Sequence, residues 1–156
     1  MLNVFVPGGE SLVIRHLLLD YNGTLAEDGE VLSGVAERMF RLAELLEIHV
    51  LTADTHGTVV TKLAGLPCRV TVIDSDRQDQ RKLDYLLDIG PEMTVAVGNG
   101  RNDALMLRRA QLGICLVQAE GASSVALAAA DVVALSVVHV FDMLLYPSRL
   151  TATLRN

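Results

Sequence analysis

The chain is poor in the residues that mark several common protein classes. It has no tryptophan, only 4% aromatic residues and two cysteines among its 156 residues. Without aromatic side chains there is little surface on which nucleic-acid bases could stack, and two cysteines are too few for a disulfide framework. Basic residues are also scarce, since 13 Lys and Arg stand against 19 Asp and Glu, which gives a net charge of −6. This balance argues against binding to nucleic acid or anionic membranes, because both are held by positive charge.

Long apolar runs and targeting signals are missing as well. The most membrane-like segment, residues 125–146, is interrupted by two aspartates and a histidine, so we expect a buried strand and helix there rather than a membrane span. The N-terminus has no basic region before an apolar stretch, and we expect no signal peptide. Cys68 and Cys115 lie in apolar stretches and are interpreted as buried thiols. A reducing, cytoplasmic location is the expectation.

What the chain does have is enough apolar material for a core. At 51% apolar residues over this length, a single domain spanning 1–156 is expected. Short apolar runs alternate with segments of helical periodicity, which predicts a three-layer, Rossmann-like α/β fold with a parallel sheet and helices on both faces. Residues 1–15 are predicted to form a hairpin and residues 24–33 a loop that could act as a flap. The strands are predicted at residues 16–19, 48–51, 68–73, 94–97, 113–117 and 132–135, and the helices at 35–47, 59–64, 80–88, 103–110, 122–129 and 138–146.

Polar residues gather where the predicted strands end. In parallel sheets, chemistry collects at the carboxyl ends of the strands, and an aspartate there is a rigidly held nucleophile or metal ligand. Turns and helix caps could explain each segment alone, but not the set as a whole. The segments are DYNGT at 20–24, TAD at 52–54, DSD at 74–76 and GNGRND at 98–103.

Three of these segments resemble sequence motifs of the haloacid dehalogenase superfamily, whose members form an aspartyl phosphate. DYNGTL at 20–25 resembles the first motif, LT at 51–52 the second, and GNGRNDALML at 98–107 the fourth. The stretch that follows, to residue 135, is similar to the phosphorylation domain of P-type ATPases. The chain therefore resembles a soluble, P-type-ATPase-like member of the superfamily, and its intervals between motifs are too short for an inserted cap domain.

The resemblance implies a set of roles. Asp20 would attack a phosphoryl group, Thr52 would donate its hydroxyl to a phosphoryl oxygen, and Lys82 would supply positive charge as the lysine of the third motif, with Lys62 as the second choice. Gly23, Thr24 and Ala53 would help to hold the phosphate, with backbone N–H groups of residues 22–24 surrounding its oxygens. Mg²⁺ would offset the repulsion between the two anions. Its implied ligands are Asp20, residue 22, Asn99 and Asp103.

Two residues depart from the family pattern. Asn22 stands where phosphatases of the superfamily carry the aspartate that protonates the leaving group and activates water, and an amide can do neither. General acid–base catalysis contributes about 10²–10⁴-fold, so slow hydrolysis is expected. Asn99 replaces a carboxylate metal ligand, which predicts weaker Mg²⁺ binding.

The resemblance leaves the substrate and the turnover open. An open site would suit a macromolecular phosphate, or a small one enclosed by a neighbouring subunit in a homo-oligomer. The alternative function is a phosphate-binding or regulatory module of the same fold with impaired catalysis. A receiver domain is disfavoured, because the first strand does not end in the pair of acids that such domains use. His16, His49 and His139 lack the spacing of metal ligands, so no zinc site is predicted.

Overall fold

The core of the protein is a six-stranded parallel sheet in the strand order β10-β9-β8-β3-β6-β7. The computed structural model describes residues 1–155. β3 lies near the middle of the sheet, and four of its five residues are buried, as expected for a strand that is apolar on both faces. The sheet strands are β3 (His16–Asp20), β6 (Glu47–Thr52), β7 (Arg69–Val72), β8 (Thr94–Gly98), β9 (Leu112–Leu116) and β10 (Val132–Ala134).

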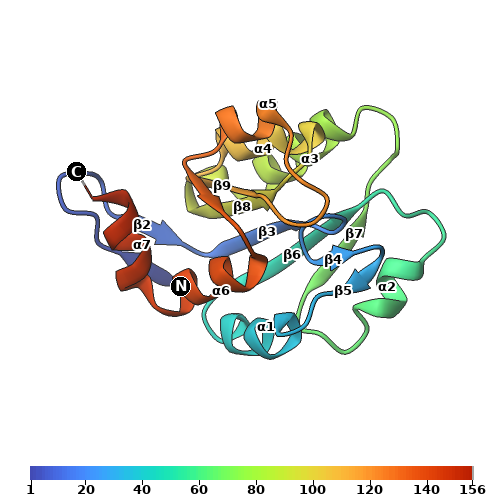
Figure 1. The fold of residues 1–156 in the computed structure, drawn as a ribbon, viewed down its shortest axis with the longest axis horizontal. Coiled ribbons are helices and arrows are strands. Elements are labelled where there is room, and N and C mark those ends of the chain that lie inside the picture. The colour runs from blue at the N-terminus through green and yellow to red at the C-terminus, as the bar shows by residue number, and fades with distance from the viewer. Residues whose placement is uncertain (156) are drawn as a thin grey trace.

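Helices cover both faces of this sheet and confirm the predicted three-layer α/β fold (Figure 1). One face carries the helices α3 (Gln78–Ile89), α4 (Ala104–Arg109) and α5 (Ser124–Ala129). The other carries α1 (Val35–Ala43) and α6 (Val137–Leu145), which pack against each other. Two short 3₁₀ helices, η1 (Pro91–Met93) and η2 (Arg101–Asp103), precede β8 and α4. No helix among residues 1–155 has the length and apolar character that crossing a membrane requires.

The two ends of the chain pack together beside the sheet. Strands β1 (Leu2–Val4) and β2 (Leu12–Ile14) pair antiparallel within the segment predicted as a hairpin. A final helix, α7 (Pro147–Leu154), lies against β1 and α6 (Figure 1), and the Thr151 hydroxyl donates to the carbonyl of Phe5 at 2.8 Å. The sequence analysis did not predict α7. Its single fully buried apolar residue, Leu150, gives too weak a periodic pattern to stand out.

The first helix is shorter than predicted. It was expected to continue to residue 47, but α1 ends at Ala43. The N–H groups of Leu45 and Leu46 both turn back to the carbonyl of Leu42, and Glu47 already pairs with His16 as the first residue of β6. The apolar spacing continues past the helix end because Leu46 is buried from the turn itself.

The segment predicted as a loop that could act as a flap contains a small hairpin. Strands β4 (Ala26–Glu27) and β5 (Glu30–Val31) are joined through Asp28 and Gly29, both with positive φ. Lys62, at the end of α2 (Thr58–Lys62), donates to the Gly29 carbonyl at 2.7 Å, and the Tyr21 hydroxyl donates to the same oxygen at 3.0 Å. The hairpin is therefore tied to the body of the domain at its turn.

Candidate active site

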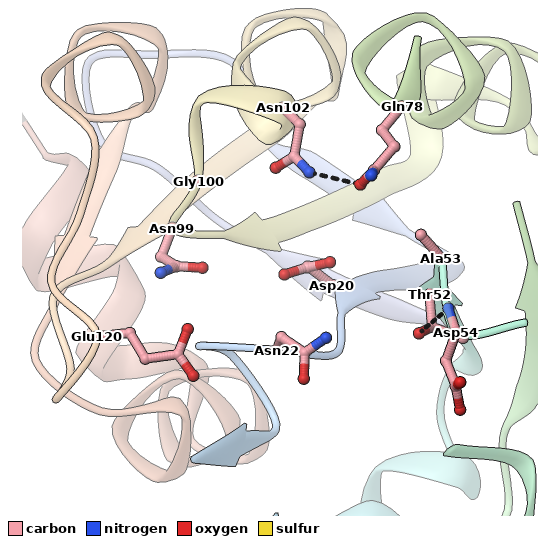
Figure 2. Close-up of a pocket in the computed structure, with 10 residues that line it drawn as sticks. All are labelled: Asp20, Asn22, Thr52, Ala53, Asp54, Gln78, Asn99, Gly100, Asn102 and Glu120. Carbon is pink, nitrogen blue, oxygen red and sulfur yellow. Dashed lines mark hydrogen bonds between the residues drawn. The ribbon is translucent and has the colours of Figure 1, made fainter. Parts of the chain in front are cut away.

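Polar residues from three adjacent strands surround one cavity at the carboxyl edge of the sheet. Asp20 ends β3, Thr52 ends β6, and Asn99 directly follows β8. Because parallel strands deliver their carboxyl ends to the same edge, residues far apart in sequence meet there. The cavity measures about 430 Å³, and Figure 2 shows these residues around it. It is lined by Asp20, Asn22, Thr52, Ala53, Asp54, Gln78, Asn99, Gly100, Asn102 and Glu120.

Lys82 is buried between two carboxylates. Its Nζ lies 2.8 Å from Asp20 Oδ1 and 2.6 Å from Asp103 Oδ1, and the lysine side chain is only 2% exposed. Lys82 reaches this position from the second turn of α3, whose other buried residue is Leu86, one turn further along the same face. Lys62, the second choice, instead pairs with Glu30 on the hairpin. The structure thus places Lys82, and not Lys62, beside Asp20.

Burial and charge set the protonation of this triad. Burial raises the pKa of Asp20 to about 7, and the negative charge of Asp103 acts in the same direction, while Lys82 opposes both. Burial by itself would lower the pKa of Lys82, but its two carboxylate neighbours outweigh this effect and raise it. The triad carries a net charge of −1 when all three groups are ionised. The ionised form of Asp20, which is the nucleophilic form, therefore benefits from any further positive charge in the cavity.

Asp103 organises the loop after β8. One of its oxygens binds Lys82, and the other accepts the backbone N–H groups of Asn99 at 2.9 Å and Gly100 at 2.8 Å. The carboxylate is fully buried and does not line the cavity. Gly98 makes this close approach possible, because a Cβ there would lie 2.4 Å from Asp103 Cγ. Asp103, predicted as a metal ligand, thus fixes the loop after β8 and the position of Lys82 through hydrogen bonds on the buried side of the cavity.

Asn99 presents its amide oxygen to the cavity. Its Nδ2 donates to the Gly121 carbonyl at 3.0 Å, which fixes the orientation of the amide. Figure 2 shows the oxygen of Asn99 turned toward Asp20. Gly23 packs against this amide with φ +74°, and a Cβ at Gly23 would lie 2.5 Å from Asn99 Nδ2.

Thr52 is positioned to donate a hydrogen bond into the cavity. Its Oγ1 accepts the backbone N–H of Asp54 at 3.1 Å, so the hydroxyl hydrogen remains for another acceptor. Asp54 accepts the N–H groups of Val59 at 2.8 Å and His56 at 2.9 Å, and these two bonds lower its pKa. Asp54 therefore fixes the start of α2 as an ionised group.

Gly23 and Thr24, which are predicted to help hold a phosphate, are not among the residues that line the cavity. Their N–H groups donate within the turn, to the carbonyls of Ala26 and Tyr21. The carbonyls of Gly23 and Thr24 both accept from Gln118 Nε2 at 3.0 Å. These N–H groups therefore close the turn in this structure, and the role of the two residues in phosphate binding stays a prediction.

Sequence reasoning missed several residues of the cavity wall. Gln78 and Asn102 join across it, with Asn102 Nδ2 donating to Gln78 Oε1 at 2.8 Å. Glu120, in the loop that follows β9, is exposed and directs its carboxylate toward the cavity (Figure 2). Its place just after a strand of the sheet is the signal that could have identified it, although no motif marks the position.

The oxygen atoms at the cavity fit a hard divalent cation. Mg²⁺ prefers carboxylate and carbonyl oxygen ligands, and a carboxylate of Asp20 faces the fixed amide oxygen of Asn99. Asn22 lines the same cavity, and the carboxylate of Glu120 is directed toward it. The donor set is compatible with Mg²⁺, although only two of these donors, Asp20 and Glu120, are carboxylates.

Comparison with known proteins agrees with this architecture. The model of the haloacid dehalogenase-like hydrolase family matches residues 80–138, which include Lys82 and the loop after β8. The uncharacterized protein MJ0073 of Methanocaldococcus jannaschii is 44% identical over 62 residues, which cover 40% of this chain and 67% of that protein.

Two solved structures share the fold over most of their length. The cobalt-bound deoxy-D-mannose-octulosonate 8-phosphate phosphatase of Haemophilus influenzae has a TM-score of 0.69 and 14% identity, over 89% of this chain and 91% of its own. The 3-deoxy-D-manno-octulosonate 8-phosphate phosphatase of Moraxella catarrhalis, solved in complex with a magnesium ion, a phosphate ion and a KDO molecule, has a TM-score of 0.65 and 16% identity, over 90% of this chain and 92% of its own. At such identities the likeness shows the fold alone.

Fold and site together define a class of protein: a parallel α/β domain without an inserted cap among its described residues, in which an aspartate ends a central strand beside a buried lysine. The family match over residues 80–138, together with the shared fold, supports the resemblance to the haloacid dehalogenase superfamily of hydrolases.

Proposed function

We propose that the protein is a Mg²⁺-dependent phosphohydrolase or phosphotransferase that works through an aspartyl phosphate on Asp20. The single observation that carries this proposal is the carboxylate of Asp20 at the cavity, held by the buried Nζ of Lys82 at 2.8 Å. A structural ion pair would not need to face a polar cavity, and a simple turn would not need a buried lysine.

The chemistry is a double displacement at phosphorus. An oxygen of Asp20 attacks the phosphoryl group, and the bond from phosphorus to the ester oxygen breaks, releasing an alkoxide that takes a proton to become the alcohol. Water then attacks the aspartyl phosphate, which releases inorganic phosphate and a proton and restores the carboxylate. Lys82 and the Thr52 hydroxyl would stabilise the phosphoryl oxygens.

Mg²⁺ would be held by Asp20, the Asn22 carbonyl and Asn99. Its positive charge would offset the repulsion between an anionic substrate and the Asp20, Lys82 and Asp103 triad, whose net charge is −1. The residues of the chain fix the oxygen donors in advance. Asn99 is oriented by Gly121, and Asp20 by Lys82. Asp103 would act here as a positioning residue.

Turnover is expected to be slow because Asn22 cannot exchange a proton. Of the cavity-lining side chains, Asp54 is committed to the N-terminus of α2, which leaves Glu120 as the lining carboxylate closest to a general acid–base role. The likeness in the segment after residue 98 to P-type ATPases, which keep a long-lived phosphoenzyme, supports slow hydrolysis too. The substrate class we propose is a phosphorylated molecule, small or macromolecular.

The alternative function is a phosphate-binding or regulatory module, and the two asparagines at positions 22 and 99 favour it. Both functions require the same cavity. They differ in whether the Asp20 carboxylate forms a covalent bond to phosphorus.

Turnover of p-nitrophenyl phosphate with Mg²⁺ separates the two. We expect weak activity that Asp20→Asn abolishes and that Asn22→Asp raises by about 10²–10⁴-fold, because it restores an acid–base group. Glu120→Gln should lower the residual activity. Asn3→Asp, which adds the same charge on exposed β1, should change nothing. Activity that persists in Asp20→Asn would refute the proposal, and no activity in any variant, with vanadate still bound, would favour the module.

A further inference from the structure

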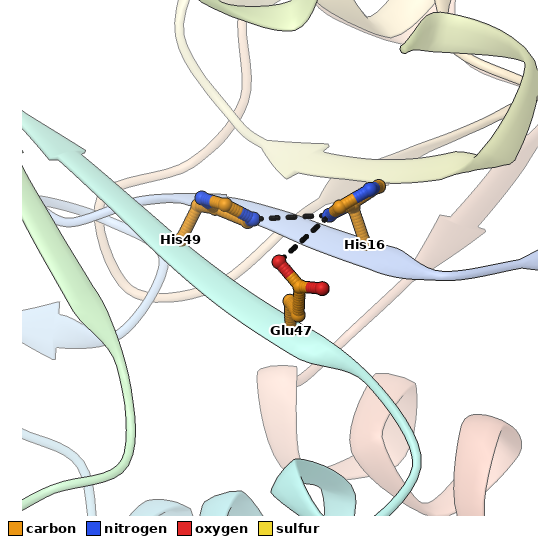
Figure 3. A group of neighbouring side chains, drawn as sticks. All are labelled: His16, Glu47 and His49. Carbon is orange, nitrogen blue, oxygen red and sulfur yellow. Dashed lines mark hydrogen bonds and ion pairs between the residues drawn. The ribbon is translucent and has the colours of Figure 1, made fainter. Parts of the chain in front are cut away.

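We propose that His16, Glu47 and His49 form a second metal site, suited to Zn²⁺ or a similar transition-metal ion, at the opposite edge of the sheet from the cavity. His16 begins β3 and Glu47 begins β6, and the pairing of these strands places His16 directly across from Glu47. His49 lies two residues along β6, on the same side as Glu47. One ligand atom from each of the three lies within 4.8 Å of the others (Figure 3).

The spacing of the two imidazoles matches shared coordination. His16 Nδ1 and His49 Nε2 are 3.2 Å apart. Two nitrogens bound to one tetrahedral Zn²⁺ at about 2.0–2.1 Å stand about 3.3–3.4 Å from each other, so little movement is needed to admit the ion. Glu47 Oε2 lies 3.7 Å from His16 Nδ1 and supplies the negative charge of the set.

Tyr85 orients the second imidazole. Its hydroxyl oxygen lies 2.9 Å from His49 Nδ1. When this nitrogen donates its hydrogen to the hydroxyl, the other nitrogen, Nε2, presents a lone pair toward His16. Metal-binding histidines are generally held by such a partner on the distal nitrogen.

The surroundings favour neutral imidazoles, which is the form that binds metal. Burial lowers the pKa of His16, and burial, His16 and Arg69 together lower the pKa of His49 to about 4. Glu47 opposes these effects, and Arg15 adds to them at His16. Both arginines are exposed, so solvent screens their repulsion of a cation.

A cavity gives access to the cluster from solvent. It measures about 380 Å³ and is lined by Glu47, His49, Cys68 and Arg69 among others. It offers room for water at a fourth position. Two imidazoles and one carboxylate favour Zn²⁺, Co²⁺ or Ni²⁺ over Mg²⁺, so this site and the all-oxygen cavity select different ions.

The sequence concealed this cluster. The spacing argument against zinc considered local motifs, whereas His16 and His49 come together only through the pairing of β3 with β6. Strands β3 and β6 also carry Asp20 and Thr52 at their carboxyl ends, and α3, which holds Tyr85, also carries Lys82. An ion bound here would cross-link the scaffold of the cavity without entering it.

Cobalt titration tests the site without relying on activity. Co²⁺ is added in the presence of excess Mg²⁺ to protein carrying Asp20→Asn, and visible absorption reports four-coordinate ligation. We expect one Co²⁺ per chain, displaced by Zn²⁺, with affinity reduced at least about 100-fold by His49→Gln. His139→Gln, on the exposed surface of α6, is the matched control and should bind as the parent does.

Two milder variants keep the test decisive if His49→Gln fails to fold. Glu47 is 66% exposed in its side chain, so Glu47→Gln should preserve the fold while weakening binding about tenfold or more. Tyr85→Phe should weaken it through loss of orientation. The proposal is overturned if the parent binds no Co²⁺ or Zn²⁺, if these variants bind as tightly as the parent, or if only Cys68→Ser removes binding.

Discussion

At the scale of single residues, Lys82 is critical because its ammonium group is buried between two carboxylates. Asp20 and Asp103 would repel each other in a medium of low polarity, and Lys82 lies within 2.8 Å of both. The same three groups link the proposed chemistry to stability, since Lys82 orients the proposed nucleophile Asp20 and also pairs with the buried carboxylate of Asp103.

Lys82→Met should destabilise the fold as well as impair phosphate chemistry. Removing one partner of a buried ion pair typically costs about 3–5 kcal/mol, because the remaining charges are left uncompensated. We expect urea unfolding at pH 7 to show a loss of this size. Adding Asp103→Asn to Lys82→Met should recover part of it.

Lys62→Met is the control for this change. Lys62 pairs with Glu30, whose side chain is 78% exposed, and solvent screens such pairs. Its effect on unfolding should be much smaller than that of Lys82→Met. Equal losses in the two variants would contradict the view that burial makes Lys82 important.

At the scale of elements, the segment after β9 connects the turn that follows Asp20 to helix α6. Gln118 donates to the carbonyls of Gly23 and Thr24, and its Oε1 accepts the N–H of Val137 at 2.7 Å. One amide thus satisfies the turn that follows β3 and the first residue of α6. Asn99, nearby, also binds this segment through Gly121.

Gln118→Ala should loosen the turn that follows Asp20. It leaves the Val137 N–H and two carbonyls without their partner, which typically costs about 1–3 kcal/mol when the groups are buried. We expect a lower urea midpoint and faster amide exchange at Val137. Gln80→Ala, which removes an exposed amide on α3, serves as the comparison, and identical exchange at Val137 in both variants would rule out the link.

At the scale of the whole molecule, an ion pair joins the first and last helices of one face. Arg38 on α1 donates to both carboxylate oxygens of Asp142 on α6, at 2.7 and 3.3 Å. The hydrogen bond from Arg38 is the main cause that lowers the pKa of Asp142, with Arg149 and His139 adding to it. The contact closes the layer formed by segments about a hundred residues apart in sequence.

The stabilisation from Asp142 should depend on pH in a defined direction. Its native pKa lies below the ordinary 3.8, so the unfolded chain binds the proton first on acidification. The contribution is therefore present above pH 3.8 and is lost as pH falls through the native pKa. We expect Asp142→Asn to lower the urea midpoint of unfolding at pH 7. At pH 3, the difference in midpoint between this variant and the parent should be smaller.

The matched variant is Asp88→Asn, which alters an exposed carboxylate on α3. It should change the midpoint little at either pH. A difference between Asp142→Asn and the parent that is the same at both pH values would contradict the ionic origin of the effect.

The sequence by itself determined the layers of the fold and the strand that carries Asp20. Apolar runs at strand length and helical spacing are local properties, so the parallel sheet and the helices on both faces could be predicted from them. The motifs likewise identified Thr52 and Asn99 as neighbours of Asp20 and made Lys82 the first choice for the lysine beside it. Local spacing could not separate Lys82 from Lys62, because both lie on helices between the relevant strands.

Only the tertiary structure decided which side chains share a site. It placed Glu120 and Gln78 at the cavity, turned the N–H groups of Gly23 and Thr24 inward, and brought His16 to His49. Each outcome depends on strand register and on competition for hydrogen bonds between segments distant in the chain. Such contacts have no counterpart in the spacing of residues along a sequence, and so they emerge only when the sheet forms.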